Sequence, residues 1–130
     1  MTTPARWIRF NLVGIAGFVL QMLTLAMMAR WTTPAIAVVV AVLVAVSHNF
    51  LWHEQVTWPG LPRDGRLRRW LSFHLTNGTV SIVTNVVVTT AVMKGLGAPL
   101  LAANAIAVAT ASVANFVVSD RFIFKHRPAL

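Results

Sequence analysis

The sequence AVVVAVLVAVSHNFLWHEQVTW, residues 37–58, recurs in outline as ANAIAVATASVANFVVSDRFIF, residues 103–124. Both copies have alanines four residues apart, then Asn-Phe, and an aromatic residue at the end. The matched residues are Ala37, Ala41, Ala45, Asn49, Phe50 and Trp58, and Ala103, Ala107, Ala111, Asn115, Phe116 and Phe124. Residues four apart share a helix face, and inside a membrane a small-residue stripe lets two helix backbones approach closely. The pattern therefore predicts a duplicated membrane hairpin.

The composition is that of a membrane protein. Of the 130 residues, 57% are hydrophobic and 11% are charged, whereas soluble domains carry roughly 25% charged residues. Four apolar segments each approach the ~20 residues that a spanning helix needs. The chain has no cysteine, which excludes disulfides and thiolate metal sites. The formal net charge is +8, and the basic residues cluster at the ends of the apolar segments. Such a distribution is typical of residues that set membrane topology and contact anionic lipid. We therefore expect no nucleic-acid partner.

We therefore predict an all-α, polytopic membrane protein that forms one domain over residues 1–130. The helices are expected at residues 10–29, 34–52, 70–93 and 99–118. They give a first hairpin at 7–53, a cytoplasmic loop at 53–69, a second hairpin at 70–118 and a basic tail at 119–130. A signal peptide is the competing interpretation of the first segment, but Arg30-Trp31 follows it in place of a cleavage site.

Basic residues predict the orientation. Nine Lys and Arg residues lie in the amino-terminal end, the central loop and the tail, and only Arg30 and Lys94 lie in the short turns. Cytoplasmic segments carry the excess of Lys and Arg. Both termini are therefore expected on the cytoplasmic side of the cell (inner or plasma) membrane.

The fronts of the two hairpins also match, although more weakly. Arg6-Trp7-x-x-Phe10 corresponds to Arg69-Trp70-x-x-Phe73 at an offset of 63, and Gly14 and Gln21 correspond to Gly78 and Asn85 at an offset of 64. The changing offset predicts small insertions within the helix and at the outer turn. Two hairpins in the same orientation imply a pseudo-twofold axis along the membrane normal, as in some transporters with parallel repeats.

Polar residues inside the predicted spans are candidates for function, because they are costly in lipid. For Gln21 and Asn85 two interpretations stay open: they pair with each other, or they contact a passing substrate. Asn49 and Asn115 either make hydrogen bonds at helix ends or form a polar wall at the mouth of a headgroup path. The candidate polar groove consists of Gln21, Asn49, Asn77, Asn85, Asn115, His48 and His74.

Charged residues gather at the predicted inner interface. The candidate lipid-phosphate-binding residues are Arg6, Arg9, Arg68, Arg69 and Arg121, and membrane topology is the rival explanation for these charges. Arginine suits phosphate because its planar fork donates two hydrogen bonds at once. Glu54 and Asp120 occupy equivalent positions and are expected to form an ion pair with Arg9 or Arg69, with coupling to protons as the second possibility.

Catalytic machinery is missing from the sequence. It contains no Gly-x-x-x-x-Gly-Lys-[Ser/Thr], no Gly-x-Ser-x-Gly and no carboxylate dyad. His48, His53 and His74 have no carboxylate or thiolate cluster at ligand spacing, so no metal site is expected. We expect neither an enzymatic activity nor a cofactor.

The chain resembles the GtrA-like family of small four-helix membrane proteins over about residues 6–124. The motifs that carry the resemblance are Arg9-Phe10-x-x-Val13-Gly14, Asn49-Phe50 with Thr57-Trp58, and Asn115-Phe116 with Phe122-Ile123-Phe124. The family commonly has a basic residue after the Asn-Phe helix end, where this sequence has Glu54 and Asp120. This difference argues against phosphate binding there and favours Arg9, Arg69 and Arg121.

The resemblance implies two functions. The first is a flippase for a polyprenyl-phosphate-linked sugar in cell-surface polysaccharide synthesis or glycosylation. The alternative is a non-catalytic anchor that stabilises a partner glycosyltransferase, with the polar face of the third helix as its docking surface. A small multidrug exporter would need an acid in the middle of the first helix, where Gln21 stands.

Two further expectations concern assembly and the phosphate site. Four short helices enclose little interior, so a homodimer or a complex with a glycosyltransferase is expected. Arg9 and Arg69, one in each hairpin, are predicted to be the main phosphate-binding pair.

Overall fold

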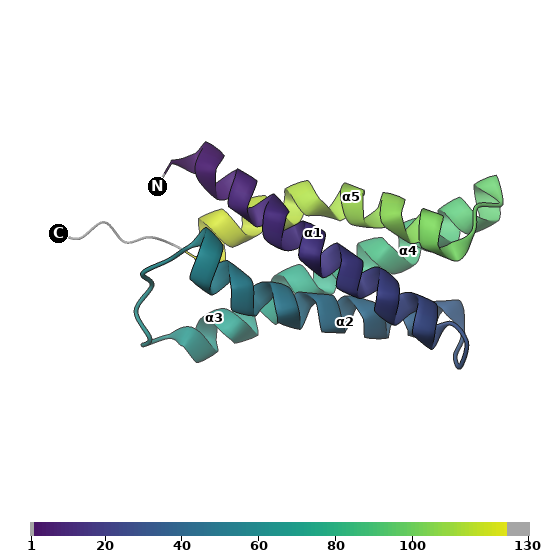
Figure 1. Ribbon diagram of the computed structural model, residues 1–130, viewed down its shortest axis with the longest axis horizontal. Helices are drawn as coiled ribbons and strands as arrows, with labels where there is room; N and C mark the ends of the chain where they lie inside the picture. The colour runs from purple at the N-terminus through teal and green to yellow at the C-terminus, as the bar shows by residue number, and fades with distance from the viewer. Residues whose placement is uncertain (1, 125–130) are drawn as a thin grey trace.

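Four helical spans make up most of the chain. The computed structural model describes residues 2–124, and Figure 1 shows its long helices running side by side. In chain order the spans are α1 (Thr3–Met28); α2 (Pro34–Trp52) with the π-helical turn η1 (His53–Thr57); α3 (Arg66–Phe73), the π-helical turn η2 (His74–Gly78) and α4 (Thr79–Leu96); and α5 (Leu100–Val118) with the π-helical turn η3 (Ser119–Ile123). All four are long and apolar enough to cross a membrane. The predicted all-α architecture with four spanning helices is confirmed.

Local sequence sets several of the helix ends. The Thr33 hydroxyl accepts a hydrogen bond from the Ile36 amide (3.5 Å), and Pro34 takes the first helical position of α2, where its missing N–H is tolerated. Gly65 (φ +83°) precedes α3, and Gly97 (φ +65°) follows α4. Glycine adopts this left-handed backbone without the steric cost that a Cβ would bring.

Helical structure extends further than the sequence predicts. α1 begins at Thr3 instead of residue 10, and the predicted loop at 53–69 shortens to 58–65 because η1 and α3 extend into it. η3 makes residues 119–123 of the predicted tail helical. Two acids of these segments form ion pairs at the helix ends: Glu54 with Arg66 and Arg69, and Asp120 with Arg6. The rest of the predicted tail, with Lys125 and Arg127, lies outside the described residues.

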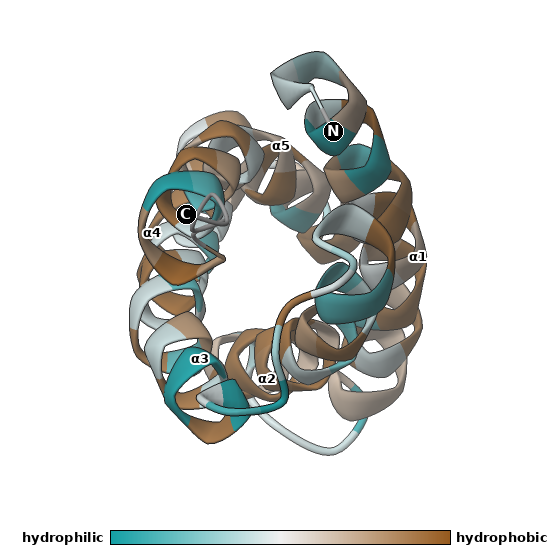
Figure 2. Cartoon of the chain, turned by 90° about the vertical axis from the view of Figure 1, so that its left-hand side faces the viewer, coloured by the Kyte–Doolittle hydropathy of each residue, from teal (hydrophilic) through white to brown (hydrophobic). Residues whose placement is uncertain are grey.

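The spans form a ring in the order α1, α2, α4, α5, which Figure 2 shows from one end. Both ends of the described chain and the 58–65 loop lie at one end of the bundle, and the two short turns, residues 29–33 and 97–99, lie at the other (Figure 1). We name the second the turn end. The first we name the basic end, because it carries Arg6, Arg9, Arg63, Arg66, Arg68, Arg69 and Arg121.

The alanine stripes of α2 and α5 face the inside of the bundle, as predicted. Every stripe alanine exposes 4% of its surface or less, so the neighbouring helix backbones lie close to these positions. The outward faces are apolar instead: Leu12, Val19 and Leu23 of α1 are each more than half exposed. Small residues inside and large apolar residues outside are the pattern of a bundle surrounded by lipid.

Aromatic rings fill the bundle close to the basic end. Trp58 stacks on Phe124 with ring centroids 4.3 Å apart, and Phe10 stacks on the His53 ring at 4.4 Å. Phe73 contacts both His53 and Phe124. These five residues, which we name the aromatic layer, each expose 6% of their surface or less. The layer lies between the bundle interior and the basic end.

Positions matched by sequence spacing meet in the fold. Trp58 and Phe124, at an offset of 66, form the stacked pair described above. The turns η1 and η3 begin at the same offset. η2 lies between Phe73 and Gly78, where the offset between the hairpins changes from 63 to 64. A π-helical turn bonds residue i to i+5, so η2 accommodates the one extra residue without breaking the span.

Candidate functional site

An amide network joins three helices inside the bundle. The Gln21 amide nitrogen donates to Oδ1 of Asn85 (3.0 Å) and of Asn104 (2.7 Å). The Asn104 amide nitrogen donates to Asn85 Oδ1 (2.9 Å) and to Thr89 Oγ1 (3.0 Å). All four side chains are buried. Gln21 and Asn85, which occupy matched positions in the two hairpins, are therefore hydrogen-bonded to each other, and Asn104 is bonded to both.

The network lies between the middle of α1 and the turn end. Gln21 is seven residues from Met28, where α1 ends, which corresponds to roughly 10 Å along the helix. From the sequence, Gln21 is expected near the middle of a first helix predicted at residues 10–29. Because α1 begins at Thr3, most of its added length lies on the other side of Gln21.

A small chamber extends from this network toward the aromatic layer. It has a volume of about 80 Å³ and is lined by polar side chains from all four spans, together with Phe10 and His53 at its basic-end side. Its polar lining includes Gln21, Asn49, Ser81, Asn85 and Asn115. Sites for small molecules usually have roughly 300–1,000 Å³. The chamber therefore has room for a few water molecules but not for a sugar.

A second polar group lies on the basic-end side of the chamber. The Asn115 amide nitrogen donates to Ser81 Oγ (2.7 Å), and the Asn77 amide nitrogen donates to Ser119 Oγ (2.5 Å) and to the Asn115 carbonyl (3.2 Å). Within the described chain, the side-chain oxygens of Asn77 and Asn115 are buried without a hydrogen-bond partner. Such orphaned acceptors are costly. Each can accept a hydrogen bond from water or from a hydroxyl group of a ligand.

The predicted polar groove is only partly assembled. Gln21, Asn49, Asn85 and Asn115 line the chamber, and Asn77 lies beside it. His48 and His74 do not line it: His48 contacts Asn49 Oδ1 (3.2 Å), and His74 contacts Ser47 Oγ (3.2 Å) and the Trp70 carbonyl (2.9 Å). Successive residues of a helix point in directions about 100° apart. His48 and Asn49 therefore lie at a similar depth but on different faces of α2, and only Asn49 faces the chamber.

Two groups of ion pairs cross between the hairpins at the basic end. Glu54 of η1 accepts from Arg69 (2.9 and 2.7 Å) and pairs with Arg66 (2.7 Å). Asp120 of η3 pairs with Arg6 (2.9 Å) and accepts from the Trp58 indole (3.2 Å). Each acid is therefore held by an arginine of the other hairpin. Of the two partners named by the sequence expectation, Arg69 pairs with Glu54, whereas Arg9 pairs with neither acid among the described residues. Arg66 and Arg6 are the other observed partners.

The two arginines predicted to hold phosphate are both engaged with protein groups. Arg69 also donates to the carbonyls of Pro62 (3.0 Å) and Asp64 (3.3 Å), in addition to its bonds with Glu54. Arg9, which is exposed, donates to the Val56 carbonyl (3.0 Å). Both side chains reach η1, so the fold brings them to one segment. The Arg69 guanidinium, however, is directed at a carboxylate and two carbonyls.

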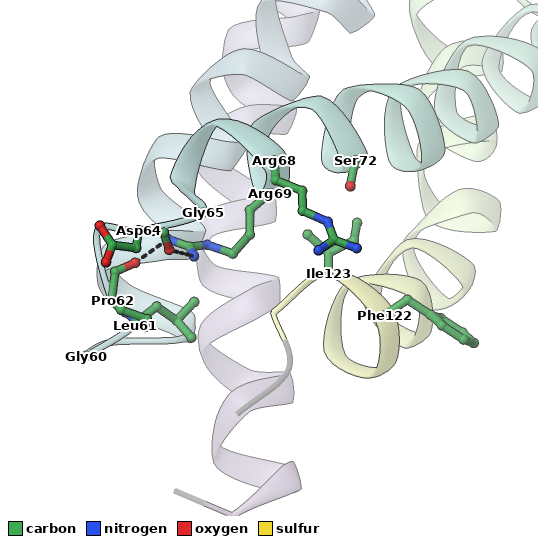
Figure 3. Close-up of a pocket in the computed structure, with 10 residues that line it drawn as sticks. All are labelled: Gly60, Leu61, Pro62, Asp64, Gly65, Arg68, Arg69, Ser72, Phe122 and Ile123. Carbon is green, nitrogen blue, oxygen red and sulfur yellow. Dashed lines mark hydrogen bonds between the residues drawn. The ribbon is translucent and has the colours of Figure 1, made fainter. Parts of the chain in front are cut away.

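A pocket of about 630 Å³ lies at the basic end between the loop, α3 and η3. Figure 3 shows Arg69 turned toward the carbonyls of Pro62 and Asp64, whereas Arg68 extends toward Ile123 of η3. Arg68 is exposed, and within residues 2–124 it has no hydrogen-bond or ion-pair partner. Ser72 adds a hydroxyl to the same pocket. A cation and a hydroxyl in a pocket of this size are suited to an anionic, oxygen-rich group.

Sequence reasoning missed three of these residues. Asn104 is fully buried and takes part in more of the network's hydrogen bonds than Gln21, yet it stands next to the alanine stripe that drew attention instead. Asn104 could have been recognised from the sequence, because a large amide side chain inside an apolar span is a candidate functional residue by default. Arg66 and Ser119 carried no comparable signal, since their partners come from distant segments.

Comparison with known proteins gives one match. The family model described as GtrA/DPMS, transmembrane domain, matches residues 9–124. No curated protein and no solved structure matches the chain. The matched range covers all four spans, from the first turns of α1 to the aromatic residue that follows η3.

Proposed function

The chain belongs to the GtrA/DPMS transmembrane family, and from this premise we propose that it is a flippase for a polyprenyl-phosphate-linked sugar. The four spans and the family together identify a multi-pass membrane protein. The family suggests a role in polyprenyl-phosphate sugar translocation or in polysaccharide synthesis. The proposal assigns no reaction and no cofactor to the chain itself.

The observation that carries the proposal is the polar interior. Buried amides and hydroxyls follow one another from Asn104 and Gln21 on the turn-end side to Asn77 and Ser119 near the basic end. Polar groups inside a membrane are costly, and they commonly mark a substrate path. A phosphate-linked sugar is strongly polar, and moving it through hydrocarbon alone would cost many kcal/mol. Donors and acceptors on all four spans would lower that cost.

The pocket at the basic end supports a first docking site for the phosphate. Arg68 and Ser72 line it, and its volume of about 630 Å³ is sufficient for a sugar phosphate. Of the predicted phosphate ligands, we assign the main role to Arg68 and, on the neighbouring η3, to the exposed Arg121. Arg6 and Arg69 already neutralise carboxylates, and Arg9 keeps a secondary role.

We place the basic end on the cytoplasmic side of the cell (inner or plasma) membrane. Nine of the eleven Lys and Arg residues belong to this end or to the tail that follows it, which is the distribution of cytoplasmic segments. We also propose that the hairpins are parallel repeats related by a pseudo-twofold axis along the membrane normal. The stacked Trp58 and Phe124 support this, because equivalent residues meet where such an axis passes.

Transport by the purified chain tests the flippase proposal. Liposomes containing a fluorescent polyprenyl-phosphate sugar are prepared with and without the protein, and a membrane-impermeant quencher measures the lipid in the outer leaflet over time. We expect protein-dependent exchange that slows by about tenfold or more in Arg68→Ala, the loss of a charge-assisted hydrogen bond of roughly 1.5–3 kcal/mol. Arg30→Ala, which removes an exposed charge at the turn end, is the control and should transport normally. Absence of exchange by the unaltered chain would contradict a flippase.

The small chamber favours a second candidate, a non-catalytic anchor for a glycosyltransferase. About 80 Å³ does not hold a sugar, so transport requires the helices to move or a second subunit to complete the path. We propose a homodimer or a complex with a glycosyltransferase as the working assembly. An anchor would stabilise the enzyme in membranes while showing no exchange in the liposome assay, and this combination distinguishes the two functions.

A further inference from the structure

An apolar groove on the lipid-facing surface lies between α1 and α5. It has a volume of about 280 Å³ and includes Gly14, Ile15 and Phe18 of α1 and Ala105, Ala109 and Ser112 of α5. Ile15 is 60% exposed, so the groove opens toward lipid. Gly14, Phe18 and Ser112 also line the polar chamber. The groove and the chamber therefore lie on opposite sides of the same few residues.

The equivalent seam between α2 and α4 is packed more tightly. A Cβ added at Gly14 would meet no atom within 4 Å, whereas one added at the equivalent Gly78 would lie 3.8 Å from a methyl group of Val46. At an offset of 66, three of the four groove residues of α5 are smaller than their counterparts on α2, and the fourth, Val108, corresponds to Val42. The three pairs are Ala105 and Val39, Ala109 and Leu43, and Ser112 and Val46. Three smaller side chains leave more space along the α1–α5 seam than along the α2–α4 seam.

We infer that the α1–α5 groove is the lateral entrance of the lipid. Its isoprenoid chain lies in the groove, and movement of the helices widens the chamber beyond about 80 Å³ to admit the phosphate and sugar. The inference rests on the proposed function for the identity of the lipid. The polar chamber behind the groove determines the chemistry of the occupant: a molecule that fills both must be polar at one end and apolar along its length. A second copy of the chain would cover the groove and leave the chamber without a polar ligand.

The aromatic layer gives a second reason for a lateral entrance. Phe10, His53, Trp58, Phe73 and Phe124 separate the chamber from the basic end, and all are buried. A headgroup that entered along the bundle axis would have to part these rings. At Gly14 the seam is open without such a displacement.

Photolabelling tests the groove directly. The purified full-length chain, in nanodiscs of phosphatidylcholine and phosphatidylglycerol, is illuminated with farnesyl phosphate that carries a diazirine on its isoprenoid chain, and labelled residues are identified by mass spectrometry. We expect labels on α1 around Gly14 and on α5 around Ala109. Gly14→Leu should reduce them at least fivefold. Gly95→Leu is the matched control, because Gly95 also has open space around its Cα but lies outside the groove, and it should leave labelling unchanged.

Several outcomes would overturn the inference. They are equal labelling of the α2–α4 seam, unchanged labelling in Gly14→Leu, and equally strong labelling by a diazirine phosphatidylcholine, which would mean bulk lipid. Disulfide-linked dimers of Ala109→Cys in native membranes would identify a second copy as the occupant, since the chain has no other cysteine. If Gly14→Leu fails to fold, the pair Ala109→Leu and Ser112→Val, which copies α2, replaces it.

The photolabelling result and the liposome result can fail independently, so they test the lateral entrance and the flippase function separately. Labelling of the groove without exchange in liposomes would keep the inference and reject the flippase. Exchange that persists in Gly14→Leu, with no label in the groove, would do the reverse.

Discussion

Replacing Asn104 by Leu tests whether the amide network holds the bundle together. Asn104 exposes none of its surface and takes part in three side-chain hydrogen bonds, with Gln21, Asn85 and Thr89. Hydrogen bonds between membrane helices average about 0.6 kcal/mol each, so three bonds amount to about 2 kcal/mol. Leucine has the same branching and the same number of side-chain heavy atoms as asparagine, with bulkier methyl groups, so the substitution leaves no cavity. We expect Asn104→Leu to lower the free energy of unfolding by about 2 kcal/mol.

The measurement is reversible unfolding of the purified protein in mixed micelles, as a denaturing detergent is titrated. A double-mutant cycle with Gln21→Leu should give a coupling energy of about 0.6 kcal/mol, and no more than about 1.7 kcal/mol. Thr110→Val is the control, because this exposed hydroxyl bonds to the Ile106 carbonyl of its own helix (2.9 Å), and it should unfold like the parent. An Asn104→Leu variant as stable as the parent, with no coupling to Gln21, would refute a structural role and leave substrate contact as the reason for the network.

Three other substitutions probe the packing and the charges. Ala41→Leu should cost about 1–3 kcal/mol through overpacking, because Ala41 has no exposed surface, and an unchanged melting temperature in detergent would contradict the packing of the stripe. Gly17→Ala should also melt lower, since a Cβ there overlaps an amide side chain on α2, whereas Gly14→Ala should not; equal melting of the two would be evidence against the close approach. Arg69→Gln should lower the melting temperature more than Arg66→Gln, because the Arg69 side chain is 14% exposed and the Arg66 side chain is 53% exposed. Exposed ion pairs contribute little to stability. The opposite order would contradict Arg69 as the main partner of Glu54.

The sequence predicts the spans because membrane helices have strong local signals. Length, apolar composition and the bracketing proline and glycine residues are all properties of one segment at a time. The alanine stripes are equally local, and their burial follows from a spacing of four along one helix. The matched amides Gln21 and Asn85 were identified for the same reason. Their pairing could be proposed as one of two alternatives, because equivalent residues in parallel repeats lie near a shared axis.

The details of the site depend on contacts that spacing does not reveal. Arg69 was predicted to bind phosphate, but its guanidinium meets Glu54 because helical structure continues through η1 and brings that carboxylate toward α3. Arg68, one residue earlier, extends toward Ile123 of η3 (Figure 3). A difference of one residue thus decides which arginine is free, and it follows from the rotation of the helix relative to distant segments. No local pattern contains that information.

For the proposed translocation of a lipid headgroup, the two possible routes break different contacts. The axial route requires Trp58 to leave Phe124 and Phe10 to leave His53, two stacked pairs that are worth about 0.5–1.5 kcal/mol each beyond their burial. It also separates Arg6 from Asp120, which join the two hairpins at that end. The lateral route through the α1–α5 groove breaks none of these contacts, and there the isoprenoid chain can remain in lipid throughout. Hinging of α1 away from α5 about the basic end keeps the aromatic layer and the ion pairs intact. It breaks the Gln21–Asn104 hydrogen bond (2.7 Å), a loss of about 0.6 kcal/mol that is smaller than that of the two stacked pairs.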